Sequence, residues 1–156
     1  MAPSVHIPAT RARHTADMSD CVFCSIVAGE TAADVVYRDD RVMAFLDRSP
    51  VFKGHVLVVP TTHVPTLTEL PVAEIGHYFT TVQRIASAVP TALQADGTFV
   101  AINNVVSQSV PHLHTHVVPR RRKDGLRGFF WPRVKYADAL EAEQFAALIR
   151  ARLAAE

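Results

Sequence analysis

The segment SQSVPHLHTHVVPRR, residues 107–121, has histidines at every second position, His112, His114 and His116. A repeat of two is the side-chain period of a β-strand, so on a strand all three imidazoles leave the same face. Such a group is costly to bury without partners, because protonated rings repel and neutral rings leave donors unsatisfied. The segment therefore predicts a strand over residues 112–118 whose histidines bind a ligand.

Two ligands suit this arrangement, a metal ion and a phosphate. His-x-His on a strand can present two imidazoles to zinc. A neutral imidazole can also attack phosphorus and form a phosphorus–nitrogen bond that water breaks later. The compact polar residues just upstream, Ser107, Gln108 and Ser109, favour phosphate chemistry, which needs hydrogen-bond donors for the phosphoryl oxygens.

The order of apolar segments predicts an α+β domain built on a mostly antiparallel five-stranded sheet with two main helices. Short apolar runs predict strands over residues 35–37, 42–46, 55–59 and 98–103, besides 112–118. The polar turn 38–41 predicts that the first two form a hairpin. Residues 21–30, CVFCSIVAGE, indicate one or two helical turns that end at Gly29.

The first main helix is expected to begin near Pro71. Apolar residues at spacings of three and four predict its buried face: Val72, Ile75, Phe79, Val82, Ala86 and Val89. Pro90 should end or kink this helix. The second helix begins at the acidic capping pair of Asp138 and Glu141, with a packing stripe of Leu140, Phe145, Leu148 and Ile149.

The length and composition suit a single core, with 156 residues of which 49% are hydrophobic and 20% charged. We expect a flexible lead-in over residues 1–19, a domain over 20–120 and a basic, aromatic tail with a helix over 121–156. A net charge of +1 excludes a globally basic nucleic-acid binder, and we expect no nucleic-acid partner. The first twenty residues lack the apolar run of a secretory signal and no segment reaches transmembrane length, which predicts a cytoplasmic protein.

The pattern Q-S-V-x-H-x-H-x-H resembles the signature of the histidine triad (HIT) family of nucleotide hydrolases and transferases. The segments CVFCSIVAGE, AFLD and KGHVLVVP, followed by His63, stand in the family's order over residues 20–120. The resemblance is to the branch that hydrolyses purine nucleoside phosphoramidates. It implies a covalent nucleotidyl-histidine intermediate, no requirement for a catalytic metal, and a homodimer.

The resemblance implies a role for each matching residue around the triad. His114 matches the nucleophile that takes the nucleoside monophosphate from the substrate. His116 and Ser109 match groups that hold the phosphate and the leaving atom, with Gln108 beside them. His55 matches a histidine that supports the triad.

It also implies how the nucleotide is held. Asn103 matches an asparagine that contacts the phosphate region, and Asp47 matches the carboxylate that accepts both ribose hydroxyls. An acceptor there suits a vicinal diol, which offers two donors. The base would lie in an apolar slot, for which core packing is an equally good explanation, formed by Val22, Phe23, Ile26 and Phe45.

One loop departs from the family's pattern. Only Asn-Val-Val-Ser separates Asn103 from Gln108, and Ser107 stands where a glycine is usual. Because this loop shapes the side of the site where the leaving group lies, the departure puts the substrate preference in doubt.

Cys21 and Cys24 form a Cys-x-x-Cys pair with three interpretations: a redox pair, two zinc ligands, or two free buried thiols. A thioredoxin-type pair follows a strand, whereas a polar lead-in precedes this one. Structural zinc needs two more ligands, which His63 and His112 can supply. The resemblance to bacterial relatives with this set implies a zinc ion that ties the N-terminal turn to the sheet, with His112 on the metal side of a divided triad.

The tail is rich in arginine and lysine over residues 120–135, with aromatic residues between them: Phe129, Phe130 and Trp131. A solvated charged surface is the ordinary explanation. Aromatic faces beside cations also suit stacking on a base at the far end of a dinucleoside polyphosphate, reached across a dimer interface. We expect no role at the site for the remaining histidines, His6, His14 and His77.

The leading hypothesis is therefore an enzyme that cleaves at the α-phosphorus of purine nucleoside phosphoramidates or related nucleotides. Hydrolysis of dinucleoside polyphosphates by the same residues is one alternative. The other is a zinc-stabilised nucleotide-binding module that regulates a partner and has lost its chemistry.

Overall fold

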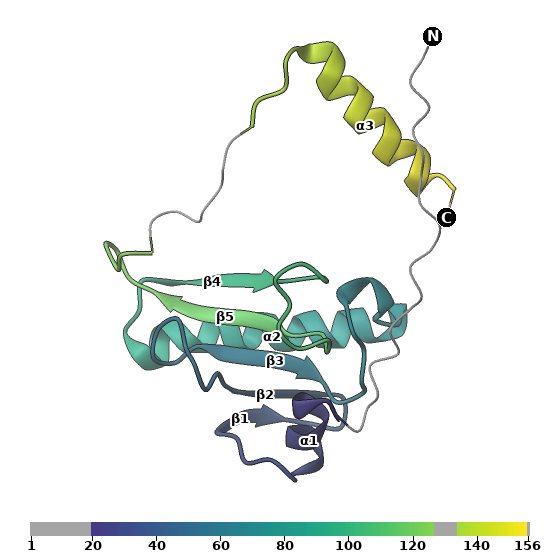
Figure 1. The fold of residues 1–156 in the computed structure, drawn as a ribbon. Helices are drawn as coiled ribbons and strands as arrows, with labels where there is room; N and C mark the ends of the chain where they lie inside the picture. Colours follow the sequence, from purple (N-terminus) through teal and green to yellow (C-terminus); the bar gives the residue numbers. More distant parts are fainter. Residues whose placement is uncertain (1–19, 127–133, 156) are drawn as a thin grey trace. The chain divides into compact units, whose positions relative to one another are not determined.

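The computed structural model describes residues 20–126 and 134–155 and forms two units, one up to Arg122 and one from Lys123 (Figure 1). The elements of the first unit, in chain order, are α1 (Val22–Ala28), β1 (Val35–Arg38), β2 (Val42–Leu46), β3 (Val56–Pro60), the short 3-10 helix η2 (Leu67–Glu69), α2 (Val72–Leu93), β4 (Gly97–Ile102) and β5 (Thr115–Arg120). The second unit contains α3 (Ala139–Leu153). The predicted lead-in, residues 1–19, and the aromatic residues of the tail lie outside the described residues. Among the residues that are described, no helix is long and apolar enough to cross a membrane.

The strands form one sheet in the order β1-β2-β3-β5-β4, and each neighbouring pair is antiparallel. This confirms the predicted α+β fold and the hairpin of β1 and β2. Gly29 caps α1 with a φ of 79°, a left-handed conformation that glycine adopts without steric cost, so the predicted end of this helix is also confirmed.

The strand side chains alternate between two hydrophobic layers, as the strand period requires. The layer facing α2, which crosses one side of the sheet (Figure 1), includes Val42, Ala44, Val56, Val58 and Val117. The layer facing α1 includes Met43, Phe45, Leu57 and Val59, together with Phe23 and Ile26 from α1. Any residue of even number in β5 therefore faces the α1 side, because Val117 faces α2.

The predicted buried face of α2 is wrong in its first half. Val72 is 85% exposed, and Ile75 and Phe79 are also exposed, whereas Tyr78 is 1% exposed. The apolar pattern misplaced the buried face because a polar group occupies it. The Tyr78 hydroxyl donates to the carbonyl oxygen of Val58 and pairs with the Thr115 hydroxyl, each at 2.8 Å. With both partners supplied, the phenol is buried at little cost.

Pro90 does not end α2, which continues to Leu93. It lies in the last turn, where the missing N–H removes one hydrogen bond and few residues follow. Gln94 then closes the helix with a φ of 53°, and the backbone N–H of Ala95 donates to the Pro90 carbonyl at 3.0 Å.

The histidine strand begins later than predicted. β5 starts at Thr115, so His112 and His114 lie in the segment that enters the strand. The strand ladder pairs Thr115 with Val58 of β3 and with Ile102 of β4, and ends there. The backbone N–H of Leu113 instead donates to the carbonyl oxygen of Val64 at 2.6 Å.

In the second unit the capping prediction for α3 is confirmed, because the Asp138 carboxylate accepts from the backbone N–H of Glu141 at 2.8 Å. The predicted packing stripe does not form a buried layer within this unit. All four of its residues are more than half exposed: Leu140, Phe145, Leu148 and Ile149. Phe145 contacts the ring of Tyr136 instead.

We predict that Tyr78→Phe lowers the free energy of unfolding by about 1–2 kcal/mol, because it leaves the buried Val58 carbonyl and Thr115 hydroxyl without their shared partner. Urea unfolding would measure the change. The matched control is Tyr136→Phe, at a residue that is 59% exposed, where we expect a change below about 0.5 kcal/mol. Equal effects of the two substitutions would contradict the prediction.

Candidate active site and metal site

A cavity of about 300 Å³ opens on the α1 side of the sheet. Its apolar wall includes all four residues of the predicted base slot: Val22, Phe23, Ile26 and Phe45. Its polar lining includes Asp47, Ser109, His114 and His116. The volume lies at the small end of the roughly 300–1,000 Å³ that is typical of small-molecule sites. One cavity therefore combines an apolar slot with two imidazoles and a carboxylate.

The His114 ring is held in one tautomer. Its Nδ1 lies 2.7 Å from the carbonyl oxygen of His112, and only an N–H can donate there. In the neutral ring, Nε2 is then the nitrogen with the lone pair. The ring edge-packs against Phe23, with 5.2 Å between centroids, and is 3% exposed. This arrangement leaves a nucleophilic nitrogen on a ring whose orientation is fixed.

His116 lies in β5 opposite Leu57 and faces the cavity. Behind it, Nδ1 of His116 lies 3.0 Å from Nε2 of His55, which is 3% exposed. His55 stands just after Gly54, whose φ of 93° and close approach to the Leu93 side chain favour glycine. The structure thus brings three predicted residues together: His55 and His116 form a pair, and the His116 ring lies beside that of His114.

The charge state of this pair follows from burial. Burial lowers the pKa of His116 to about 4; the neighbouring His114 and His55 lower it as well, while Asp47 opposes them. Burial also lowers the pKa of His55, again opposed by Asp47. Both imidazoles are therefore neutral at neutral pH before a ligand enters.

Asp47 lines the cavity with its carboxylate tied at two points. Oδ1 accepts from the backbone N–H of Ser49 at 2.8 Å, and Oδ2 lies 3.4 Å from Nδ1 of His55. The sequence did not indicate the contact with His55. The two ligand nitrogens of His55 and His116 are hydrogen bonded to each other, so we assign no metal to this group.

Two residues expected near the phosphate do not line the cavity. Gln108 donates from Nε2 to the carbonyl oxygen of Pro65 at 2.6 Å and accepts from the backbone N–H of Val105 at 3.0 Å. The side-chain amide of Asn103 donates to the carbonyl oxygen of Ser107 at 3.4 Å. Both side chains therefore brace the loop that precedes the triad.

This loop carries backbone strain. Val105 and Ser107 have φ values of 68° and 61°, in the left-handed region where a Cβ is unfavourable. Valine is especially disfavoured there because it is β-branched. Ser107 is the position at which the resemblance implies a glycine, and its φ of 61° is a conformation that suits glycine.

Four further residues converge beside the cavity, as the sequence predicted: Cys21, Cys24, His63 and His112. Their ligand atoms all lie within 4.8 Å of one another. Sγ of Cys24 lies 3.2 Å from Nδ1 of His63, and Sγ of Cys21 lies 3.5 Å from Nδ1 of His112. A tetrahedral zinc ion with two sulfur and two nitrogen ligands holds neighbouring ligand atoms about 3.3–3.8 Å apart. The four residues therefore fit a zinc ion.

The chemistry of the donors supports this fit. Nε2 of His112 donates to the Pro60 carbonyl oxygen at 2.9 Å, which leaves Nδ1 with a lone pair directed at the thiols. Burial lowers the pKa of His112 to about 4, so the ring is neutral as a ligand must be. Burial raises the pKa of Cys24 to about 11, with the neighbouring Cys21 adding to the effect. Without a cation, this pocket therefore keeps the Cys24 thiol protonated.

Sequence reasoning missed part of the cavity lining. Arg48 and Ser49 lie at its polar end, and Ala33, Leu46, Leu57 and Val110 complete the apolar wall. Arg48 and Ser49 directly follow Asp47, so their place in the chain was the available signal. Outside the cavity lining, Nε2 of His77 lies 2.8 Å from the Asp39 carboxylate.

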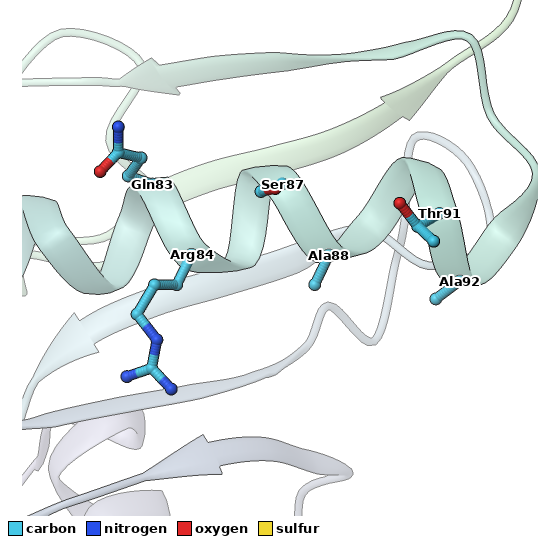
Figure 2. Close-up of a pocket in the computed structure, with 6 residues that line it drawn as sticks. All are labelled: Gln83, Arg84, Ser87, Ala88, Thr91 and Ala92. Carbon is cyan, nitrogen blue, oxygen red and sulfur yellow. The ribbon is translucent and has the colours of Figure 1, made fainter.

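A second hollow runs along the exposed face of α2, lined by Gln83, Arg84, Ser87, Ala88, Thr91 and Ala92 (Figure 2). Arg84 is the one ionisable residue of this lining, and its guanidinium lies 5.0 Å over the ring of Tyr37. With neither an imidazole nor a carboxylate, the lining offers no counterpart to the chemistry of the histidine cavity.

Comparisons with known proteins agree with this geometry. The family described as "HIT domain" matches residues 28–123. Protein hit of Bacillus subtilis is 40% identical over 114 residues, which cover 72% of this chain and 79% of the relative. The crystal structure of a HIT family member from B. subtilis has a TM-score of 0.78 at 35% identity and covers 85% of this chain and 96% of its own. A Zn-bound histidine triad family protein from Mycobacterium smegmatis has a TM-score of 0.66 at 38% identity, with coverage of 85% and 98%.

Two relatives carry the names of enzymes. An adenylylsulfatase of Arabidopsis thaliana is 36% identical over 110 residues, which cover 69% of this chain and 56% of the relative. An asymmetrical bis(5'-nucleosyl)-tetraphosphatase of Schizosaccharomyces pombe is 34% identical over 94 residues, which cover 59% and 52%.

We predict that zinc binding to the metal-free protein releases at least one proton at pH 7, because Cys24 changes from a thiol with a pKa of about 11 to a bound thiolate. Titration calorimetry in buffers of different ionisation enthalpy would count the protons. Cys24→Ser should lose stoichiometric zinc and melt at a lower temperature, whereas Ser25→Ala, one residue away, should keep its zinc. Zinc uptake without proton release would contradict this assignment.

We also predict that Ser107→Gly raises the free energy of unfolding by about 0.5–1 kcal/mol, because glycine adopts the φ of 61° without strain. The matched control is Ser87→Gly in the exposed face of α2 (Figure 2). There glycine should lower the free energy of unfolding by about 0.5 kcal/mol, because it has the lower helix propensity. Chemical unfolding of both variants tests the sign. A loss of stability at both positions would show that the loop does not favour glycine.

Proposed function

The chain belongs to the HIT family, and we propose that it hydrolyses or transfers nucleotides by attack of His114 on the α-phosphorus of a purine nucleoside phosphoramidate or a related nucleotide. The observation that carries the proposal is the hydrogen bond from Nδ1 of His114 to the His112 carbonyl, which leaves Nε2 as a nucleophile in the cavity. Serine and imidazole groups beside it can bind phosphoryl oxygens.

In the first step, Nε2 of His114 forms a bond to phosphorus, and the bond from phosphorus to the leaving nitrogen or oxygen breaks. The leaving atom takes a proton from His116 or through Ser109, both of which line the cavity. In the second step, water attacks phosphorus and the phosphorus–nitrogen bond to His114 breaks, which releases the nucleoside monophosphate. Neither step requires a metal ion.

The nucleoside is expected to lie along the apolar wall, with Asp47 accepting its ribose hydroxyls. Oδ1 of Asp47 already accepts one backbone N–H, and the lone pairs that remain are available to a diol. Asn103 and Gln108 contribute by holding the loop before the triad. The apolar wall includes Phe23 and Phe45, whose rings suit the face of a base.

A second candidate is hydrolysis of dinucleoside polyphosphates by the same residues, favoured by the similarity to the S. pombe tetraphosphatase. The similarity to an adenylylsulfatase favours a nucleotide substrate with another leaving group. All three reactions break a bond at the phosphorus of a nucleotide, so one nucleophile serves each of them. A binding module without chemistry is the remaining alternative.

We propose that Cys21, Cys24, His63 and His112 hold a zinc ion with a structural role, supported by their ligand spacing and by the similarity to the Zn-bound mycobacterial protein. Three expectations stay predictions: the division of the chain at residues 20 and 120, the cytoplasmic location, and the role of the basic tail. A homodimer is also proposed from the family resemblance, and light scattering would decide it.

Intact-mass measurement after brief mixing with adenosine phosphoramidate tests the proposal. The wild-type protein should gain one adenylyl group, seen after an alkaline quench because phosphorus–nitrogen bonds are acid-labile. His114→Ala should show no adduct and lose at least about 10⁴-fold in turnover while it keeps affinity for AMP.

His77→Ala is the matched control, because it removes a histidine that contacts Asp39 and lies outside the cavity. It should form the adduct like the wild type. Absence of both adduct and free AMP would overturn the phosphoramidase proposal. Cleavage of a dinucleoside tetraphosphate alone would then favour the second candidate, and nucleotide binding without turnover would favour the module.

A further inference from the structure

Nδ1 of His55 has two neighbours that require opposite protonation states. The backbone N–H of Val51 lies 3.3 Å away and donates to it, which requires a lone pair on Nδ1. Oδ2 of Asp47 lies 3.4 Å away and can only accept, which requires a proton on Nδ1. One nitrogen satisfies one neighbour at a time, so Nδ1 of His55 either accepts from Val51 or carries a proton at ion-pair distance from Asp47.

The tautomer of His55 determines which tautomer of His116 faces the cavity, because the two rings are hydrogen bonded. When Val51 donates to Nδ1, His55 donates from Nε2 to Nδ1 of His116, and the cavity-facing Nε2 of His116 carries a proton. When Nδ1 carries the proton, at ion-pair distance from Asp47, His55 accepts from Nδ1 of His116, and the cavity-facing nitrogen of His116 has a lone pair. His116 is thus a donor in the first state and an acceptor in the second.

We propose that Asp47 is a positioning residue that acts on His116 through His55, by stabilising an additional proton on the imidazole pair at the moment when the leaving group must be protonated. This inference rests on the proposed function and adds to it a role for Asp47 that differs from binding ribose.

The proton balance of the two steps requires such a group. With an anionic substrate bound, the pair holds three protons, and the positive charge lies on His55 beside the Asp47 carboxylate. His116 gives its Nε2 proton to the leaving atom and takes the Nε2 proton of His55 on Nδ1. His55 keeps its Nδ1 proton beside Asp47, so the pair ends neutral with a lone pair facing the cavity.

The second step reverses these transfers. The lone pair of His116 takes a proton from the attacking water while the His116 Nδ1 proton returns to His55. Without Asp47, the positive charge on His55 would be buried with no counter-ion, at a residue that is 3% exposed. The carboxylate therefore makes the protonated pair attainable in a buried site.

The charges around the pair support this assignment. Asp47 raises the proton affinity of both imidazoles, whereas burial and the neighbouring His114 lower it. Arg48 also lines the same cavity. Asp47 is the nearest carboxylate to the pair among the residues that the structure describes, at 3.4 Å from His55.

Histidine side-chain ¹⁵N NMR tests the inference without turnover. The zinc-loaded protein at pH 7.5, with inorganic phosphate as an anion that lacks a ribose, should hold a measurable fraction of His55 with the proton on Nδ1. Asp47→Asn should reduce that fraction at least about threefold and leave the proton on Nε2. Asp40→Asn, at an exposed aspartate in the turn between β1 and β2, is the control and should match the wild type. Identical His55 spectra for the wild type and Asp47→Asn would overturn the inference.

Kinetics with a substrate that lacks both ribose hydroxyls then separates the two roles of Asp47. Because the first step needs a protonated pair, kcat falls as pH rises through the pKa of the bound complex, and Asp47→Asn lowers that pKa. With 2',3'-dideoxyadenosine phosphoramidate, the basic limb of kcat should move by about 1 pH unit toward lower pH. An unchanged limb would mean that Asp47 serves the ribose only.

The NMR measurement distinguishes failure of this inference from failure of the proposed function, because the His55 tautomers can be measured in a protein that has no turnover. If Asp47→Asn does not fold, spectra of the wild type at decreasing pH decide. The first additional proton should appear on His55 with Nδ1 bonded to Asp47, and its appearance on His116 or His114 would overturn the inference.

Discussion

The hydrogen bond between Nδ1 of His114 and the carbonyl oxygen of His112 is the contact on which the rest of the site depends. It sets the tautomer of His114, and the tautomer decides whether the nitrogen in the cavity is a donor or a nucleophile. The carbonyl belongs to a residue whose side chain is 0% exposed and faces two cysteines. The position of one buried residue therefore influences both the candidate metal site and the proposed nucleophile. A metal ion held by His112 would stiffen the backbone that orients His114 and take no part in the chemistry.

The polar groups of the cavity form a connected series. Asp47 contacts His55, His55 contacts His116, and the rings of His116 and His114 lie 4.9 Å apart. The four members come from three parts of the chain: Asp47 directly follows β2, His55 directly precedes β3, and His114 and His116 lie just before and within β5. The sheet brings these segments together, because β2, β3 and β5 are neighbours in it.

The sequence predicted the fold class, the hairpin, the end of α1 and the four residues that gather as a metal site. The hairpin and the end of α1 depend on local turn residues. The metal site depends on cysteine and histidine, which are typical zinc ligands. The buried face of α2 and the start of β5 could not be predicted, because they depend on partners far along the chain. Tyr78 is buried because its hydroxyl donates to the Val58 carbonyl and accepts from the Thr115 hydroxyl. His112 leaves the strand because its ring contacts the Pro60 carbonyl and the two cysteines. The contact of Asp47 with His55 likewise depends on a loop conformation that no spacing reveals.

The Tyr78 hydroxyl has a consequence for the register of the sheet. Val58 and Thr115, which it joins, are direct partners across β3 and β5. A slip of one residue between these strands would exchange the faces of β5 and turn His116 toward α2 and the hydrophobic core. The phenol can bond both residues only in the native alignment, so it discriminates against the slipped pairing. The helix on the far side of the sheet thereby determines which face receives the histidine.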